Sequence, residues 1–439
     1  MNTFSMSFGI KVVQGTFARH FVSRAFVVGC LLFSVLSAHA TINVSLQMLL
    51  GNPSNATAST TNHNHYLIQR DIEAMDYNDT RRQVNWASWH YTPGDTGSSG
   101  RGSFSVDTSL PPGFYQVLTT DYSGSGYDRG HMCPSGDRTV STTVNDETFL
   151  MSNMIPQAPD NNQGIWANLE TYSRAIAASN ECLVICGPQG FGSAVTASSG
   201  QIPIASNVWK IIVAVPLGAG DTLSRITSNT RVIAVNIPNI QGIRTDPWQN
   251  YLTSVNQLQT NTGFNFFTTL NTNLATILRA KVDGSASTGI TNVAPTSGSV
   301  GDSVLIRGTN FTGTTTVWFN GQAATFTLNS ANQITATVPA SATTGPLSVI
   351  AAGGISTTAS NFTVNAVAVP QPTLSIALSG GNVVLSWPTN ATGYNLQQTA
   401  ALNPSTWTNY VGAVNTIGTN KTVTLTTPSG HMFFRLSNP

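Results

Sequence analysis

Short apolar stretches alternate with polar turns along most of this chain. Three of them predict β-strands, namely residues 183–185, 208–215 and 231–235. The second is apolar at nearly every position, which indicates a strand buried on both faces in the interior of a sheet.

Apolar positions at helical spacing predict three helices, over residues 162–178, 251–258 and 273–279. In the first, Trp166, Leu169 and Ile176 are expected to face the core. Strand and helix patterns are therefore mixed up to residue 282.

The charge content falls sharply after residue 282. Residues 283–439 hold two acidic and three basic side chains, with short β-like stretches rich in Gly, Pro and Thr. We expect a mixed domain over 41–282, a Gly/Ser-rich linker over 283–292, and two β modules over 293–367 and 368–439.

The N-terminus has the pattern of a secretory signal. Lys11, Arg19 and Arg24 precede or flank an apolar stretch at 25–36, and Ala38-His39-Ala40 is a small-x-small cleavage pattern. We predict that residues 1–40 are a signal peptide and that the protein is secreted or periplasmic, with association with the cell surface left open. The apolar stretch is too short to span a bilayer, and no transmembrane span is expected.

The charge balance does not resemble that of a typical nucleic-acid binder. Residues 41–282 hold 13 basic and 16 acidic side chains, and 11 of the basic ones are Arg. A protein of this balance that binds nucleic acid must rely on a few placed arginines and a metal ion, because a broad basic surface is missing.

The most informative segment is Asp128-Arg129-Gly130-His131, which places a carboxylate, a guanidinium and an imidazole within four residues. A neutral histidine is a natural general base near pH 7, and an arginine fork suits phosphate oxygens. The glycine permits close approach of the backbone to a neighbour or ligand.

Two further blocks follow it, at 152–157 (SNMIPQ) and 161–170 (NNQGIWANLE). The three blocks, in this order, resemble the DNA/RNA non-specific endonuclease family, which includes secreted bacterial nucleases and mitochondrial endonuclease G. The resemblance covers about residues 66–282. It implies an α+β nuclease domain, with a ββα-metal core and a central antiparallel sheet, that hydrolyses DNA and RNA through contacts with the phosphate backbone.

The resemblance also implies roles for individual residues. His131 would be the general base that activates water, and Arg129 and Arg101 would bind phosphate and stabilise its charge. Asn162 would bind the metal ion, and an oxygen ligand points to Mg²⁺, with Mn²⁺ as a substitute. Glu170 would orient a water bound to that metal ion.

Asn153 matches a second asparagine of the family, expected to contact the substrate phosphate or to begin a helix. On a regular helix Asn162, Trp166 and Glu170 drift by only about 40° per step, so that one helix face could direct Asn162 and Glu170 into one site. Asp128 is expected to orient its neighbours.

The β modules carry resemblances of their own. Residues 294–311 resemble the start of an IPT/TIG immunoglobulin-like domain, and residues 383–397 are similar to part of a fibronectin type III sandwich with a buried Trp387. We expect immunoglobulin-like sandwiches, with a glycan or a protein as a candidate ligand.

The cysteines leave alternatives open. An extended strand would separate Cys182 and Cys186 by about 13 Å, too far for a mutual disulfide. Cys133 could pair with either of them, or all three could be free buried thiols. A zinc site of His131 with the three cysteines is a rival hypothesis for the chemistry.

A cell-surface adhesion protein with an inactive nuclease-like head is the alternative function.

Overall fold

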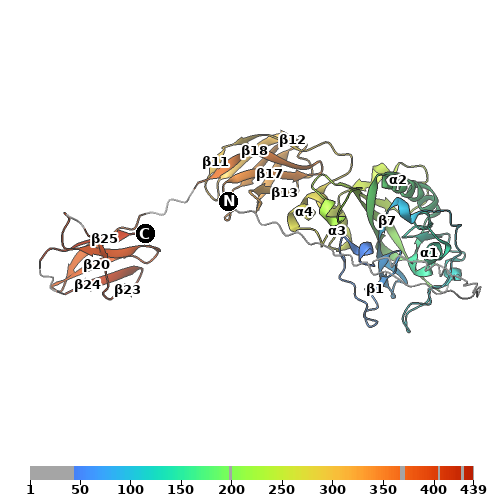
Figure 1. Ribbon diagram of the computed structural model, residues 1–439, viewed down its shortest axis with the longest axis horizontal. Coiled ribbons are helices and arrows are strands. Elements are labelled where there is room, and N and C mark those ends of the chain that lie inside the picture. Colours follow the sequence, from blue (N-terminus) through green and yellow to red (C-terminus); the bar gives the residue numbers. More distant parts are fainter. Residues whose placement is uncertain (1–43, 197–199, 366–370, 404–405, 427–429, 439) are drawn as a thin grey trace, which may run out of the picture. The chain divides into compact units, whose positions relative to one another are not determined.

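The computed structural model describes residues 44–196, 200–365, 371–403, 406–426 and 430–438 (Figure 1). The predicted signal peptide, residues 1–40, lies outside these ranges. No helix within them is both long and apolar enough to cross a membrane.

A seven-stranded sheet forms the centre of the first domain, in the order β1-β2-β3-β6-β7-β8-β9. Its strands are β1 (Tyr66–Gln69), β2 (Ala74–Asn78), β3 (Gln83–Tyr91), β6 (Asn180–Val195), β7 (Pro203–Pro216), β8 (Arg231–Pro238) and β9 (Leu252–Thr253). Every neighbouring pair is antiparallel. The three predicted strands are confirmed as parts of β6, β7 and β8, and β7 lies inside the sheet as expected.

Both faces of this sheet are covered. This agrees with the sequence of β7, which is apolar on both of its sides. Helix α2 (Ala167–Ala177) contributes Leu169 and Ala177 to the apolar cluster on one face. Helices α3 (Val255–Thr262) and α4 (Thr272–Ala280) contribute Leu258 and Leu278 to the cluster on the other face. Figure 1 shows α2 and α3/α4 on opposite sides of β7.

A two-stranded ribbon lies on the α2 side of the domain. Strand β4 (Asp128–His131) pairs antiparallel with β5 (Met154–Gln157), with Asp128 opposite Gln157 and His131 opposite Met154. The short helix α1 (Thr142–Glu147) lies between them in the chain. The ribbon followed by α2 is the ββα unit that the sequence predicts.

Two of the three predicted helices differ from the observed ones in their bounds: α2 begins later than predicted, and α3 both begins and ends four residues later. Residues 161–166 form a π-helical turn, η6 (Asn161–Trp166), before α2 begins. Helix α3 begins at Val255, not at 251, because the Ser254 hydroxyl accepts a hydrogen bond from the Gln257 amide and caps the helix there. Helix α4 matches the prediction for 273–279 to within one residue at each end.

The first β module is a sandwich of two sheets, in the orders β10-β12-β16-β15 and β11-β18-β17-β13-β14. Its strands are β10 (Gly289–Ala294), β11 (Ser297–Gly298), β12 (Ser303–Thr309), β13 (Thr316–Phe319), β14 (Gln322–Ala324), β15 (Phe326–Ser330), β16 (Gln333–Thr337), β17 (Gly345–Ala351) and β18 (Gly354–Val364). Val304, Phe311 and Val349 are buried between the sheets.

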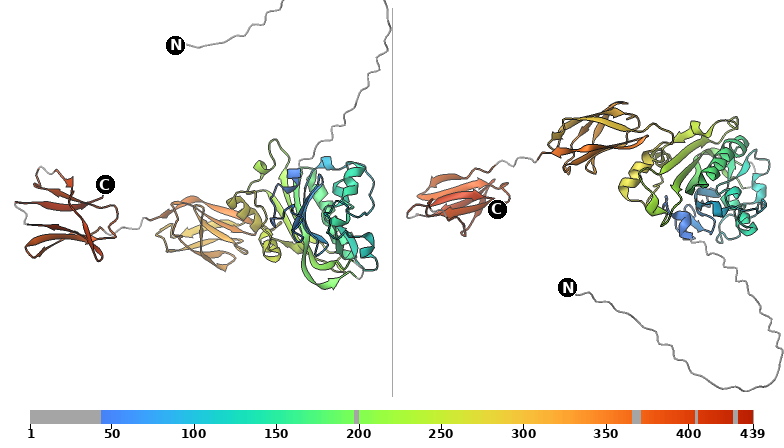
Figure 2. Two further views of the ribbon diagram at one scale, coloured as in Figure 1. Left: turned by 90° about the horizontal axis from the view of Figure 1, so that it is seen from below. Right: turned by 45° about the horizontal axis from the view of Figure 1, so that its top comes forward.

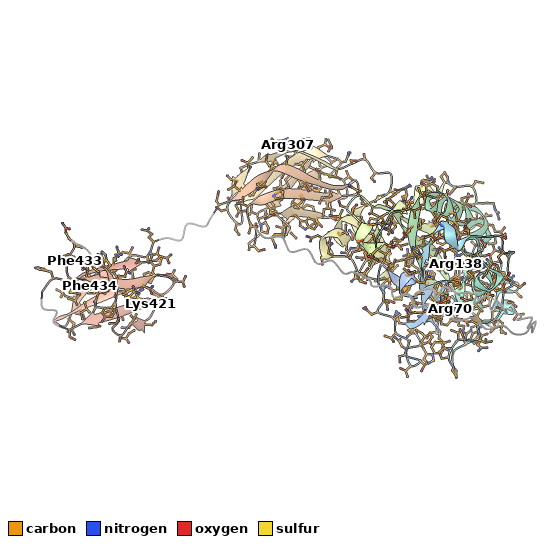
Figure 3. The ribbon with its side chains drawn as sticks, viewed as in Figure 1. Arg70, Arg138, Arg307, Lys421, Phe433 and Phe434 are labelled. Atoms are coloured by element: carbon orange, nitrogen blue, oxygen red, sulfur yellow. The ribbon has the colours of Figure 1, made fainter. Side chains whose placement is uncertain are left out.

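The second β module is also a sandwich, with sheets β19-β20-β24-β23 and β22-β21-β25 (Figure 2). Its strands are β19 (Ser375–Ser379), β20 (Asn382–Pro388), β21 (Asn395–Thr399), β22 (Thr408–Asn409), β23 (Asn415–Ile417), β24 (Asn420–Leu425) and β25 (Phe433–Ser437). Trp387 is buried in its core, as predicted, and Phe434, labelled in Figure 3, packs against that core.

Candidate active site

One groove of about 510 Å³ brings together five of the six predicted site residues: Arg101, Arg129, His131, Asn162 and Glu170. They come from the loop that precedes the ribbon, from β4, from η6 and from α2. Residues separated by up to 69 positions in the chain therefore share one surface.

The β4–β5 ribbon positions Arg129 and His131. Side chains alternate along a strand, so that these two residues project to the same side of the ribbon. Gly130 between them is required by packing, because a Cβ atom there would lie 2.0 Å from Oε1 of buried Gln157. Gln157 in turn donates a hydrogen bond of 2.6 Å to Oδ1 of Asn161 and so connects the ribbon to η6.

His131 has the properties of a proton acceptor. Its ring makes an edge contact with Phe149, with ring centroids 4.8 Å apart, and a tilted contact with Phe104 at 5.5 Å. Burial, then the charges of Arg101 and Arg129, lowers the pKa of the imidazole to about 3. Its buried Nε2 has no hydrogen-bond partner among the described residues. The imidazole is therefore neutral at pH 7 and can accept a proton.

The same two aromatic rings also support both arginines. The Arg129 guanidinium lies 4.2 Å from the centroid of the Phe104 ring, and the Arg101 guanidinium lies 5.1 Å from that of Phe149. Neither arginine forms an ion pair with a carboxylate in the described part of the chain. Their positive charges are thus available to phosphate oxygens.

Asp128 accepts a hydrogen bond from the side-chain amide of Asn162. Oδ2 of Asp128 accepts hydrogen bonds from Nδ2 of Asn162, at 2.9 Å, and from Nε2 of Gln163, at 2.7 Å. Because the amide nitrogen of Asn162 is engaged, its Oδ1 is the end left for a cation. The nearby Gly164 packs so closely that a Cβ atom there would lie 2.5 Å from the carbonyl oxygen of Arg244.

Glu170 lies one turn into α2, and its side chain is 15% exposed toward the groove. Burial raises the pKa of its carboxyl group, while Lys210 and Arg174 act against that rise and Asp137 adds to it. An amide oxygen and one carboxylate in the same groove suit a hard, largely hydrated dication such as Mg²⁺. The described residues hold no group of three or more His, Cys, Asp or Glu placed to bind a metal ion.

The sequence of residues 50–273 matches the family model described as "DNA/RNA non-specific endonuclease". The chain belongs to the DNA/RNA non-specific endonuclease family. Residues 288–364 match the IPT/TIG domain, so that the first β module of this endonuclease is an immunoglobulin-like IPT/TIG module.

Named relatives of this endonuclease are nucleases. A "Nuclease" of Nostoc sp. is 41% identical over 243 residues, which are 55% of this chain and 87% of that protein. "Nuclease C1" of Cunninghamella echinulata var. echinulata is 34% identical over 156 residues, 34% of this chain and 61% of that protein. Human "Endonuclease G, mitochondrial" is 34% identical over 127 residues, 28% of this chain and 42% of that protein. The matched segment thus spans less than two thirds of the last two relatives.

Asn153, the sixth predicted site residue, does not line the groove of the endonuclease. Its side chain is fully buried, its Oδ1 accepts a hydrogen bond of 3.0 Å from the Cys133 amide, and its Nδ2 donates to the carbonyl oxygens of Cys133 and Thr148. The expected contact between Asn153 and the substrate is therefore corrected. The side-chain amide of Asn153 therefore hydrogen-bonds the backbone of the loop that follows His131 and holds this loop in place.

Arg174 is a groove residue that the sequence pattern did not single out. It lines the groove one helical turn after Glu170, and its Nη1 lies 3.0 Å from Oδ1 of buried Asp137. The i, i+4 spacing from Glu170 on a predicted helix is the signal that could have indicated it.

The three thiols do not form the rival zinc site in the endonuclease. Cys133, Cys182 and Cys186 are all free and buried. Cys186 contacts the Met132 sulfur at 3.8 Å instead of a metal-ligating side chain. Burial raises the pKa of the Cys182 thiol to about 12, which disfavours the thiolate that zinc requires.

Proposed function

We propose that this member of the family is a secreted, metal-dependent endonuclease that hydrolyses phosphodiester bonds of DNA and RNA with His131 as the general base. The observation that carries the proposal is that His131, whose imidazole has a pKa lowered to about 3, lines one groove together with Arg101 and Arg129. The signal-like pattern of residues 1–40 supports secretion.

In the proposed reaction, His131 takes a proton from the attacking water while the water oxygen forms a bond to phosphorus. The bond from phosphorus to the leaving oxygen breaks, and that oxygen gains a proton from a solvent water. The neutral state of the imidazole makes it competent for this step without prior deprotonation. Arg129 and Arg101 bind the non-bridging oxygens and stabilise the charge that accumulates on them.

Asn162 would hold the divalent cation through Oδ1, which the hydrogen bond from its Nδ2 to Asp128 leaves available. When bound, Mg²⁺ supplies Lewis-acid stabilisation of the negative charge on the phosphoryl and leaving oxygens. Glu170 would orient a water molecule of the hydrated ion from the next turn of helix, because its carboxylate lines the same groove.

Broad specificity follows from the kind of contact. Arginine and a metal ion bind phosphate oxygens that every nucleotide carries, and such contacts hold no sequence information. DNA and RNA are therefore both expected substrates.

Degradation of a supercoiled plasmid and of a long RNA, measured with Mg²⁺ and with EDTA, tests the proposal. We expect cleavage of both substrates with Mg²⁺, none with EDTA, and none by a folded His131→Ala variant. A folded protein that binds but does not cleave either substrate with Mg²⁺ would favour the adhesion function. Undiminished cleavage in EDTA would exclude the metal site.

A further inference from the structure

A buried lysine lies directly behind Glu170. Lys210 is on β7, and its side chain is only 2% exposed. Its Nζ lies 3.7 Å from Oε1 of Glu170 and 4.2 Å from the centroid of the Trp166 ring. The Trp89 ring lies further away, at 5.7 Å. One ammonium group thus contacts both helix α2 and the turn that precedes it.

Apolar residues flank Lys210 along its own strand. Along β7 its neighbours on the same side are Val208 and Ile212, which belong to the core cluster on the α2 face, and its partner across β6 is Cys186. Glu170 is the only carboxylate that forms an ion pair with Lys210 among the described residues.

A lysine in such a place is difficult to explain by stability alone. Removing an ammonium group from water is costly, and its attraction to a partner carboxylate often does not repay that loss. An apolar side chain at this position would carry no such cost. The ammonium group therefore points to a task at Glu170.

We infer that Lys210 is a positioning residue, which fixes one oxygen of the Glu170 carboxylate and so directs the other toward the groove. The inference rests on the proposed function, in which Glu170 acts on a hydrated cation. Trp166 supports the arrangement, because it lies one helical turn before Glu170 and packs over the same ammonium group.

The charges around Glu170 agree with this assignment. Burial raises the pKa of its carboxyl group, and Lys210 is the largest influence that opposes the rise. Arg174 on α2 opposes it as well, and Asp137 adds to it. Loss of the ammonium group would leave Glu170 with a less defined orientation and a higher pKa.

The experiment compares Lys210→Met, Lys210→Arg, Glu170→Gln and the double variant of Lys210→Met with Glu170→Gln. Lys281→Met is the matched control, because Lys281 is partly buried and its ammonium group donates hydrogen bonds to the carbonyl oxygens of Ser228 and Thr230, away from Glu170. For each protein, kcat, KM, the pH profile of kcat, the thermal unfolding temperature, and the affinity for a short DNA duplex in EDTA are measured.

We expect Lys210→Met to lower kcat by about 10–100-fold, the usual range for a residue that supports a metal site from behind. KM and the affinity in EDTA should change by less than about 2-fold, since the two arginines of the groove are untouched. The acidic limb of the kcat profile should move to higher pH, and Lys210→Arg should restore part of kcat.

The double variant gives the decisive comparison. If Lys210 acts through Glu170, adding Lys210→Met to Glu170→Gln should lower kcat no further. A further loss in the double variant, or a folded Lys210→Met with the kcat and pH profile of the unmodified enzyme, would overturn the inference. If Lys210→Met and the double variant both fail to fold, Lys210 serves the fold itself and the inference is also overturned.

The proposed function and this inference fail in different ways. Full activity of His131→Ala would exclude the proposed function whatever Lys210 does. An inactive His131→Ala beside a fully active Lys210→Met would exclude the positioning role alone.

Discussion

Asp128 and Asn162, which are 34 residues apart in the chain, are joined by a hydrogen bond of 2.9 Å from Nδ2 of Asn162 to Oδ2 of Asp128. The bond crosses from β4 to η6 and decides which end of the amide faces the groove. A carboxylate accepts hydrogen bonds and cannot donate them when ionised, so Oδ1 of Asn162 is turned away from it.

Asp128→Asn should therefore weaken the metal site without removing its ligand. We expect the Mg²⁺ concentration for half-maximal activity to rise by about 10-fold or more, because the new amide can bond either end of Asn162. A Mg²⁺ titration of initial rates measures this. Asp221→Asn, at an exposed turn, is the control, and an unchanged Mg²⁺ requirement in Asp128→Asn would contradict the assigned role of Asp128.

His131→Ala should lower kcat by about 10²–10⁴-fold, the usual contribution of a general base. The fold should be retained. Loss of the His131 side chain removes its ring contacts with Phe104 and Phe149, but it breaks no hydrogen bond of the buried Nε2, which has no partner among the described residues. Plasmid nicking rates beside a circular dichroism spectrum check both parts. A folded variant with the original rate would remove His131 from the reaction.

The stability of the nuclease domain should fall as the pH is lowered from about 6.5 toward 3. His131 is neutral in the folded state over this window, since its folded-state pKa is about 3, whereas in the unfolded chain the imidazole titrates at its ordinary pKa of 6.5. The unfolded state thus binds more protons and gains stability as the pH falls. Urea unfolding of the original protein and of His131→Gln should show a flatter pH dependence in the variant; identical slopes would count against the depressed pKa.

Asn162→Ala should reduce activity more than Glu170→Ala. Asn162 is proposed as a direct ligand of the cation, whereas Glu170 acts through water, so that Asn162→Ala removes a direct contact to the ion and Glu170→Ala removes an indirect one. Initial rates at saturating Mg²⁺ and at low Mg²⁺ distinguish a ligand from a water-orienting group. The reverse order of severity would exchange the two roles.

A chain that ends at Val282 should remain an active nuclease. The five predicted site residues that line the groove lie between 101 and 170, and the sheet that supports them is complete by β9. We expect its kcat to stay within about 2-fold of that of the full chain, as for an independently folded domain. A soluble, folded but inactive product would assign the β modules a part in catalysis.

Much of the site was predictable because its chemistry is concentrated in short linear blocks. Asp128-Arg129-Gly130-His131 forms one strand, so that period-two alternation already places Arg129 and His131 on the same side. Asn162 and Glu170 come from consecutive helical segments, which a helical pattern also places close together.

Other features depend on neighbours that are distant in the chain. In the π-helical turn η6 Gly164 lies against the backbone of Arg244, and Asn153 donates hydrogen bonds to the carbonyl oxygens of Cys133 and Thr148. Lys210 is one polar residue in an apolar strand, and only the sheet register and the packing of α2 show what it contacts. Local pattern carries no information on such pairings.

The free state of Cys133, Cys182 and Cys186 bears on how the nuclease domain reaches its native structure. All three sulfurs sit in the interior as small apolar groups, so the described part of this domain contains no covalent cross-link that must form before the groove is assembled. Its folding needs neither an oxidant nor an isomerase to select among thiol pairings. Reductants that cleave the structural disulfides of many extracellular enzymes should therefore leave the architecture of this domain intact.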